Sequence, residues 1–197
     1  MSDKPPHKSR NALATVAEFE VWLSKKKTDH NYEFMCGQII KKDAMKQNEL
    51  FIVKFLTRLF SKTADYQNGA ELIPEIDVYI DDYRKRVPDL ACFSAEQIKA
   101  TRHGAKVVPA FVIELLSDSR FAVAKGFNNV ENKIQDYFDG STLNAGVQVV
   151  WYINPKTQTI YSYTSPKTVT IGTGADVCSA APTVVDFRFE VRELFKR

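Results

Sequence analysis

The stretch PAFVIELLSDS, from Pro109 to Ser119, decides how the rest of this sequence is interpreted. Its apolar side chains are typical of a buried strand, yet Glu114 lies in the middle of them. Holding a carboxylate in such a place costs free energy unless a cation or a hydrogen-bond donor pairs with it. The sequence therefore predicts a buried partner for Glu114, and the chemistry of the protein depends on what that partner is.

The composition limits the classes of protein to consider. The chain has 197 residues, 44% of them hydrophobic, so we expect a flexible lead over residues 1–14 and one domain over residues 15–197. The longest apolar runs are too short to span a bilayer, so no membrane association is expected. Three well-separated cysteines favour a reducing cytoplasm over a disulfide framework. A net charge of +3 does not by itself indicate a nucleic-acid partner.

Apolar periodicity predicts a mixed α/β sheet with helices on its faces. Capping-box spacing over Thr15 to Glu18 begins a first helix, and Asp81 to Arg86 is expected to be a polar turn between two strands. The further elements expected are a hairpin over residues 32–40, a helix over 51–60, strands over 72–80, 87–93 and 111–116, a helix over 128–138, and strands from 147 onward.

A second carboxylate lies at the start of another apolar strand. Asp89 precedes the run Leu90 to Phe93, and Glu114 follows in the next long strand. If these strands are neighbours, the two carboxylates lie side by side, where each raises the pKa of the other unless a cation lies between them. Oxygen ligands without a soft partner favour Mg²⁺ or Mn²⁺. The alternative is that each carboxylate caps a backbone group or forms a local salt bridge.

Several segments occur in an order that resembles one known family. They are YEFMCGQII, RVPDLACF, PAFVIELLSDS, NNVENKIQDYFDGS, VQVVWYINPKTQTIYSY and VRELF. Together they resemble the Uma-two family of restriction-endonuclease-like proteins, within the PD-(D/E)xK nuclease superfamily, from about residue 15 to residue 195. The resemblance implies a single-domain restriction-endonuclease-like fold, with a central mixed β-sheet flanked by helices. It also implies Mg²⁺-dependent hydrolysis of DNA phosphodiester bonds.

The resemblance also assigns roles to individual residues. Asp89 and Glu114 would be the metal-binding carboxylates, helped by the backbone carbonyl of Leu115. Lys133 matches the family's catalytic lysine, which comes from the helix after the Glu114 strand. Glu33, in the hairpin, matches an early glutamate of the family and would assist as a further carboxylate.

Departures from the family pattern keep an alternative open. Leu116 stands where the wider superfamily has its strand lysine, and Asn129 stands where relatives often carry aspartate. Many relatives also have a histidine near the start of the second helix, where this chain has Gln47 and Asn48. The alternative is a nuclease fold that binds a partner without catalysis. Cys92 is expected to pack in the core, because no histidine close in sequence could activate it.

The partner expected for the nuclease is DNA, and the chain lacks a Gly-rich phosphate loop, so no organic cofactor is expected. A homodimer is expected because two symmetric sites cut both strands of a duplex most simply. Two early lysine clusters are expected to attract phosphates, namely Lys25, Lys26, Lys27, Lys41 and Lys42.

Overall fold

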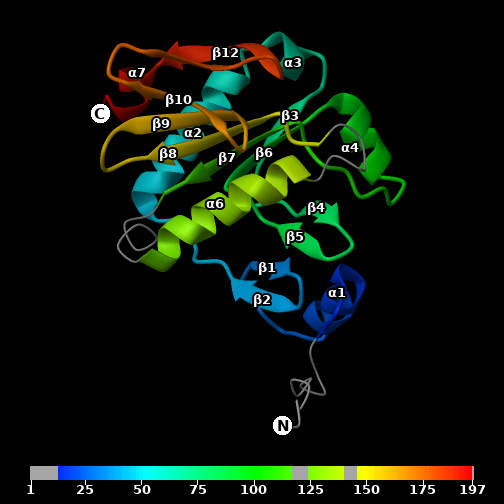
Figure 1. Cartoon of the computed structure of the whole chain (residues 1–197). Coiled ribbons are helices and arrows are strands. Elements are labelled where there is room, and N and C mark those ends of the chain that lie inside the picture. The colour runs from blue at the N-terminus through cyan, green and yellow to red at the C-terminus, as the bar shows by residue number, and fades with distance from the viewer. Residues whose placement is uncertain (1–12, 117–123, 140–145, 197) are drawn as a thin grey trace.

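The computed structural model describes residues 13–116, 124–139 and 146–196 (Figure 1). The expected lead falls almost wholly on residues 1–12, which lie outside the described residues. The described helices are α1 (Val16–Ser24), α2 (Gln47–Phe60), α3 (Ala64–Gln67), α4 (Ala95–Thr101), α6 (Ala124–Asp139) and α7 (Val191–Phe195). The described strands are β1 (Tyr32–Met35), β2 (Gln38–Lys41), β3 (Glu71–Pro74), β4 (Val78–Asp81), β5 (Arg84–Arg86), β6 (Leu90–Phe93), β7 (Phe111–Leu115), β8 (Val149–Asn154), β9 (Thr159–Ser165), β10 (Thr168–Thr173), β11 (Val177–Ala180) and β12 (Val184–Glu190).

The described strands form three sheets. The largest has six strands in the order β10-β9-β8-β7-β6-β3; β7 and β8 run parallel, and the remaining described neighbours pair antiparallel. A four-stranded sheet has the order β2-β1-β5-β4, and β11 pairs with β12. The central mixed sheet with flanking helices is therefore confirmed.

Strand alternation divides the side chains of the large sheet between two hydrophobic clusters. On β7, Phe111 and Ile113 face the cluster formed with α2, β12 and α7. Val112 and Leu116 face the other cluster, to which Ile134 and Tyr137 of α6 contribute. In Figure 1, α6 lies across one face of this sheet, with α2 on the other. Glu114 belongs by alternation to the α6 face.

The four-stranded sheet carries the first part of the chain. The predicted hairpin is present as β1 and β2, joined by Cys36 and Gly37, both with positive φ (45° and 92°), which matches the twist of the two strands. The predicted capping box of α1 is present, and Phe19 of α1 stacks on Phe34 of β1 with ring centroids 5.1 Å apart. This contact fixes the hairpin against the helix.

The predicted polar turn over residues 81–86 is wrong in its second half. Arg84–Arg86 forms β5, which lies between β1 and β4 and pairs antiparallel with both. Three consecutive basic residues resemble a solvated turn, but two neighbouring strands here supply backbone partners for a strand. As a result, Arg86 is buried rather than exposed.

Cys92 is buried on β6, so it packs in the core as expected. Burial, with a smaller contribution from the charge of Asp65, raises the pKa of its thiol to about 12.

None of the helices in the described ranges is both long enough and apolar enough to cross a bilayer.

Candidate active site

Asp89 and Glu114 lie side by side on the face of the large sheet that α6 covers. Leu90 of β6 pairs with Ile113 of β7, and extending this antiparallel register by one residue places Asp89 opposite Glu114. The backbone N–H of Leu115 donates to Asp89 Oδ2 at 2.6 Å. Both carboxylates are only 1% exposed. The two strands are thus sheet neighbours, which meets the condition set by the sequence for the two carboxylates to lie side by side.

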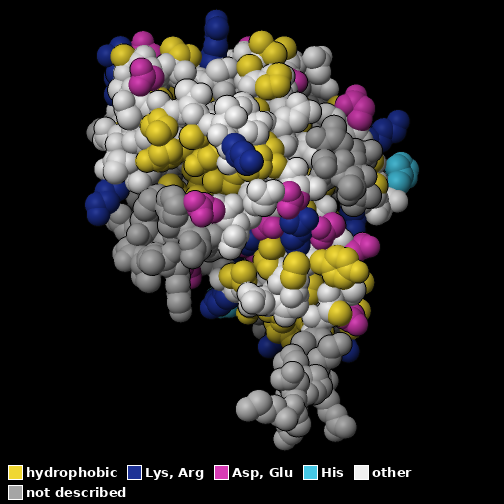
Figure 2. Space-filling view, in the orientation of Figure 1, with side chains coloured by type: hydrophobic (Ala, Val, Ile, Leu, Met, Phe, Trp, Pro, Cys, Tyr) yellow, Lys and Arg dark blue, Asp and Glu magenta, His cyan; other side chains and the backbone are white. Residues whose placement is uncertain are grey.

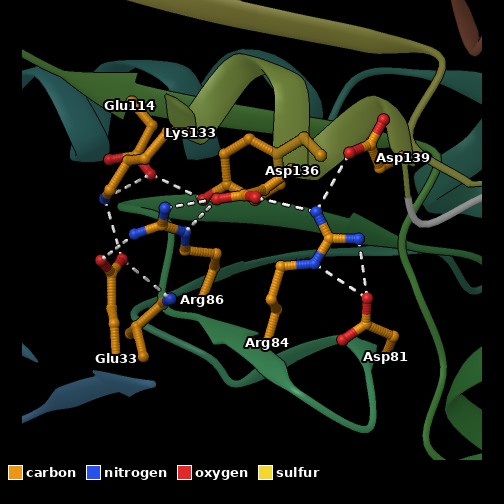
Figure 3. A network of polar contacts seen from close by, with 10 residues as sticks. Glu33, Asp81, Arg84, Arg86, Glu114, Lys133, Asp136 and Asp139 are labelled. Carbon is orange, nitrogen blue, oxygen red and sulfur yellow. Dashed lines mark hydrogen bonds and ion pairs between the residues drawn. The ribbon is translucent and has the colours of Figure 1, made fainter. Parts of the chain in front are cut away.

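The partner of Glu114 comes from α6. Lys133 Nζ lies 3.0 Å from Glu114 Oε1, and the hydroxyl of Tyr137 donates to the same oxygen at 2.6 Å (Figure 3). Lys133 and Tyr137 are one helical turn apart, so both reach the sheet from the same side of α6. The buried partner that the sequence required is therefore a lysine, supported by a tyrosine.

Glu33, on β1 of the four-stranded sheet, also contacts the ammonium group of Lys133. Its Oε1 lies 2.8 Å from Lys133 Nζ and accepts the backbone N–H of Val87 at 3.2 Å, while its Oε2 accepts Arg86 Nη1 at 2.9 Å. Arg86 also donates through Nε to Asp136 Oδ2 of α6 at 3.1 Å and contacts the same oxygen through Nη2. Arg86 therefore joins β1 to α6 through two buried carboxylates.

Arg84 continues the network toward solvent. Its Nε donates to Asp81 Oδ2 at 2.8 Å, and its Nη1 lies 2.9 Å from Asp136 Oδ1 and 3.1 Å from Asp139 Oδ2. In Figure 2, acidic and basic side chains adjoin one another on the surface between the large sheet and the α1 region. The buried charges and the surface are thus connected by a continuous chain of ion pairs.

Lys42 is buried, although its place in a lysine cluster predicts an exposed side chain. Its Nζ lies 2.7 Å from Asp89 Oδ1 and 3.7 Å from Glu75 Oε1. The reason is strand alternation: Lys42 follows β2 directly and points inward, whereas Lys41, one residue earlier, points outward. Asp89 is therefore paired with a lysine, as Glu114 is.

Of the five lysines expected to attract phosphates, four are exposed, namely Lys25, Lys26, Lys27 and Lys41. Leu116, which stands where the superfamily has its strand lysine, is buried in the hydrophobic cluster beneath α6. The side chain of Asn129 lies outside the described residues.

Burial and pairing together set the ionisation of the network. Burial alone would raise the pKa of Glu33, but the charges of Lys133 and Arg86 outweigh it and lower the pKa to about 2. Burial would lower the pKa of Lys133, but Glu114 and Glu33 outweigh it and raise the pKa. Glu33 is therefore a carboxylate and Lys133 an ammonium at neutral pH.

The carboxylates that could hold a divalent ion at this site are a pair, Asp89 and Glu114. Within the described residues, no group of three or more His, Cys, Asp or Glu side chains is arranged to hold a metal ion. Mg²⁺ is commonly bound by one or two carboxylates with water and phosphate oxygens, and the Asp89–Glu114 pair matches that pattern. Tyr152, beside Glu114 on β8, has a buried hydroxyl with no hydrogen-bond partner in the described part of the chain.

The charges at the centre of the network balance. Four carboxylates face four cations, because Asp136 contacts Arg84 as well as Arg86. The members are Glu33, Asp89, Glu114 and Asp136 with Lys42, Arg84, Arg86 and Lys133. A divalent cation held by Asp89 and Glu114 would therefore compete with the ammonium groups that already lie against them.

Sequence reasoning missed Arg86 and Asp136, although weak signals for both were present. Arg84 and Arg86 alternate around Lys85 with the period of a strand, which would have placed two arginines on one face. Asp136 follows Lys133 by three residues and precedes Tyr137, so all three share one side of a helix.

The comparisons with known proteins concern the family and the fold. The family model that matches the chain is Uma2, described as "Putative restriction endonuclease", over residues 16–192. A solved structure, "a putative nuclease belonging to DUF820" from Anabaena variabilis ATCC 29413, superposes with a TM-score of 0.71 at 19% sequence identity, covering 89% of this chain and 96% of that one. No curated protein matches the sequence.

Proposed function

The chain belongs to the Uma2 family, and we propose that it hydrolyses DNA phosphodiester bonds with the help of Mg²⁺ or Mn²⁺. One observation carries the proposal: Asp89 and Glu114 face each other on adjacent strands, and Lys133 approaches Glu114 from α6. Paired carboxylates with a neighbouring ammonium group provide a site for a divalent ion and for a phosphate at the same place.

Each residue has a defined part in this proposal. Asp89 and Glu114, with the backbone carbonyl of Leu115, would hold the ion, which when bound polarises a phosphoryl oxygen and lowers the pKa of water. Lys133 would present its ammonium group to the charge that develops on the scissile phosphate. Glu33 contacts Lys133 Nζ, as Glu114 does, and would help to orient it.

The wider proposal concerns DNA and assembly. The exposed lysines at 25–27 and 41 would attract the DNA backbone, and their effect should weaken as salt concentration rises. We propose that the protein acts as a homodimer, since two symmetric sites suit a duplex, and that it works in the cytoplasm.

A second candidate function is supported by the burial of the same network. Lys42 contacts Asp89 and Lys133 contacts Glu114, so both carboxylates have ammonium partners in the structure described. Charges that are paired and buried in this way can stabilise one arrangement of a fold without catalysis. In this alternative the protein binds a partner through its surface, and the network is structural.

Metal binding and plasmid cleavage, measured on the same samples, distinguish the two functions. We expect wild type to bind Mn²⁺ in calorimetry and to cleave plasmid DNA. Asp89→Asn and Glu114→Gln should lose the binding and at least about a hundredfold of the cleavage rate. Glu71→Gln, at an exposed position of β3, is the matched control and should change neither.

Lys133→Met separates the two roles further, because it should reduce cleavage while leaving a divalent ion bound. A wild-type protein that is folded, binds no Mn²⁺ and leaves the plasmid intact would exclude the nuclease and favour the binding function.

A further inference from the structure

Lys42 is held in place at both its backbone and its side chain. Its backbone N–H donates to the carbonyl of Asn31 at 2.9 Å, which fixes it at the end of the β1–β2 hairpin. Its side chain is 3% exposed and ends 2.7 Å from Asp89 Oδ1. Nothing in the resemblance to the nuclease superfamily assigns a role to this lysine.

Lys42 occupies the oxygen of Asp89 that a metal ion would need. Asp89 Oδ2 accepts the backbone N–H of Leu115 at 2.6 Å and is committed to the sheet. Oδ1 accepts no hydrogen bond within the described residues and is the more available oxygen for a cation, and the ammonium group of Lys42 lies against it. An ammonium group and a divalent ion at one carboxylate oxygen repel each other strongly in a buried site. Binding of the ion therefore requires Lys42 to move.

Glu75 offers the ammonium group a second position. Its Oε1 lies 3.7 Å from Lys42 Nζ, and its side chain is 31% exposed, so a charge moved toward it is partly hydrated. The backbone N–H of Glu75 donates to the carbonyl of Asp89 at 3.3 Å, which keeps the two residues adjacent. A short rotation of the lysine side chain would exchange a buried carboxylate for a half-exposed one.

We propose that Lys42 is a displaceable counter-ion: it neutralises Asp89 in the metal-free protein and transfers to Glu75 when a divalent ion binds. The proposal rests on the proposed function, because it takes Asp89 as a metal ligand. It makes Lys42 a positioning residue that sets the concentration of metal at which the site fills.

Calorimetric titration with MnCl₂ tests the displacement directly. Lys42→Met removes the competing charge and should tighten Mn²⁺ binding by at least about tenfold. Lys42→Gln, which keeps a hydrogen-bond donor for Asp89, should show the same direction and serves if Lys42→Met does not fold. Lys99→Met, at an exposed position of α4 to which no role is given, should leave the affinity unchanged. Unchanged or weaker binding in a folded Lys42 variant overturns the proposal.

A double-mutant cycle tests the role of Glu75. Glu75→Gln should weaken Mn²⁺ binding by about threefold or more in wild type, because the displaced ammonium group loses its second partner. The same substitution in the Lys42→Met background should have no effect. An equal weakening in both backgrounds would mean that Glu75 acts on the ion itself, and the transfer would be wrong.

The outcomes separate this proposal from the function on which it rests. If neither wild type nor the Lys42 variants bind Mn²⁺, the metal site itself is absent and both proposals fail together. If wild type binds and cleaves, and Lys42→Met binds with the same affinity, the nuclease stands and the displacement alone fails. Binding by Lys42→Met that is much tighter than that of wild type supports both.

Discussion

Two consecutive residues of β5, Lys85 and Arg86, place buried positive charges on opposite faces of one strand. Lys85 Nζ lies 2.9 Å from Glu20 Oε1 and 3.0 Å from Asp77 Oδ1. It also lies over the ring of Phe19, 5.0 Å from the centroid. Arg86 points the other way, into the network of the candidate site. The two cations are almost equally inaccessible, with 1% and 2% of their side chains exposed.

Their partners differ in exposure, and this is the informative contrast. The carboxylates that face Lys85, Glu20 and Asp77, are 35% and 43% exposed. Those that face Arg86, Glu33 and Asp136, are 4% and 9% exposed. Water can therefore compensate one set of carboxylates but not the other. A buried cation alone does not mark a functional site; buried charges of both signs, coupled to one another, are the better indicator.

The largest effect is expected from Arg86→Met. This variant leaves Glu33 and Asp136 buried without their shared cation, which should lower the free energy of unfolding by about 3–5 kcal/mol. Urea denaturation followed by circular dichroism measures the change. Arg188→Met, at an exposed position of β12, is the matched control and should change stability by less than about 0.5 kcal/mol. A loss below about 1 kcal/mol for Arg86→Met would remove the contrast between the two faces.

Acid should destabilise the folded protein by protonating Glu33, the carboxylate that pairs with Arg86. The pKa of this carboxyl is lowered to about 2 in the folded protein, below its ordinary value, so the unfolded chain binds the proton more readily. The stability that Glu33 contributes is complete above its ordinary pKa and is lost as pH falls toward 2. The expected loss is on the order of 2–3 kcal/mol. Unfolding midpoints measured between pH 6 and pH 2 should fall less steeply for Glu33→Gln, and equal slopes would contradict this.

The smallest effect is expected on the other face. Lys85→Met should cost about 1–2 kcal/mol, because the half-exposed partners regain hydration and the apolar side chain still packs against Phe19. High salt should sharpen the contrast: at about 1 M NaCl the Debye length is about 3 Å, so the cost of Lys85→Met should shrink and that of Arg86→Met should persist. Equal sensitivity to salt in the two variants would show that both faces are screened alike.

The sequence was sufficient for those parts of the site that the hydrophobic pattern supports. Asp89 and Glu114 interrupt or precede apolar runs, so their two strands follow from periodicity, whereas the pairing of these strands entered only as a condition. The helix that carries Lys133 follows from the apolar stripe of Ile134 and Tyr137, but the role of Lys133 came from the family resemblance alone. The structure pairs the two strands and brings Lys133 to Glu114.

The remaining parts depend on tertiary contacts that no local pattern records. Arg86 and Lys42 are charged residues in polar surroundings, where exposure is the default expectation. They are buried because each reaches a carboxylate from a distant segment, Glu33 and Asp136 for Arg86 and Asp89 for Lys42. Local propensity indicates where a strand can form, but the partners that bury its charged side chains come from residues far along the chain.

The span of the network along the chain also bears on when the site assembles during folding. Arg86 is separated by 53 residues from Glu33 and by 50 from Asp136, and Lys133 by 19 from Glu114. Closing such long loops costs conformational entropy before the contacts return any stability. Both sheets and α6 must therefore be in place before the charges meet. We therefore expect the candidate site to assemble late in folding, after the hydrophobic layers that position its elements.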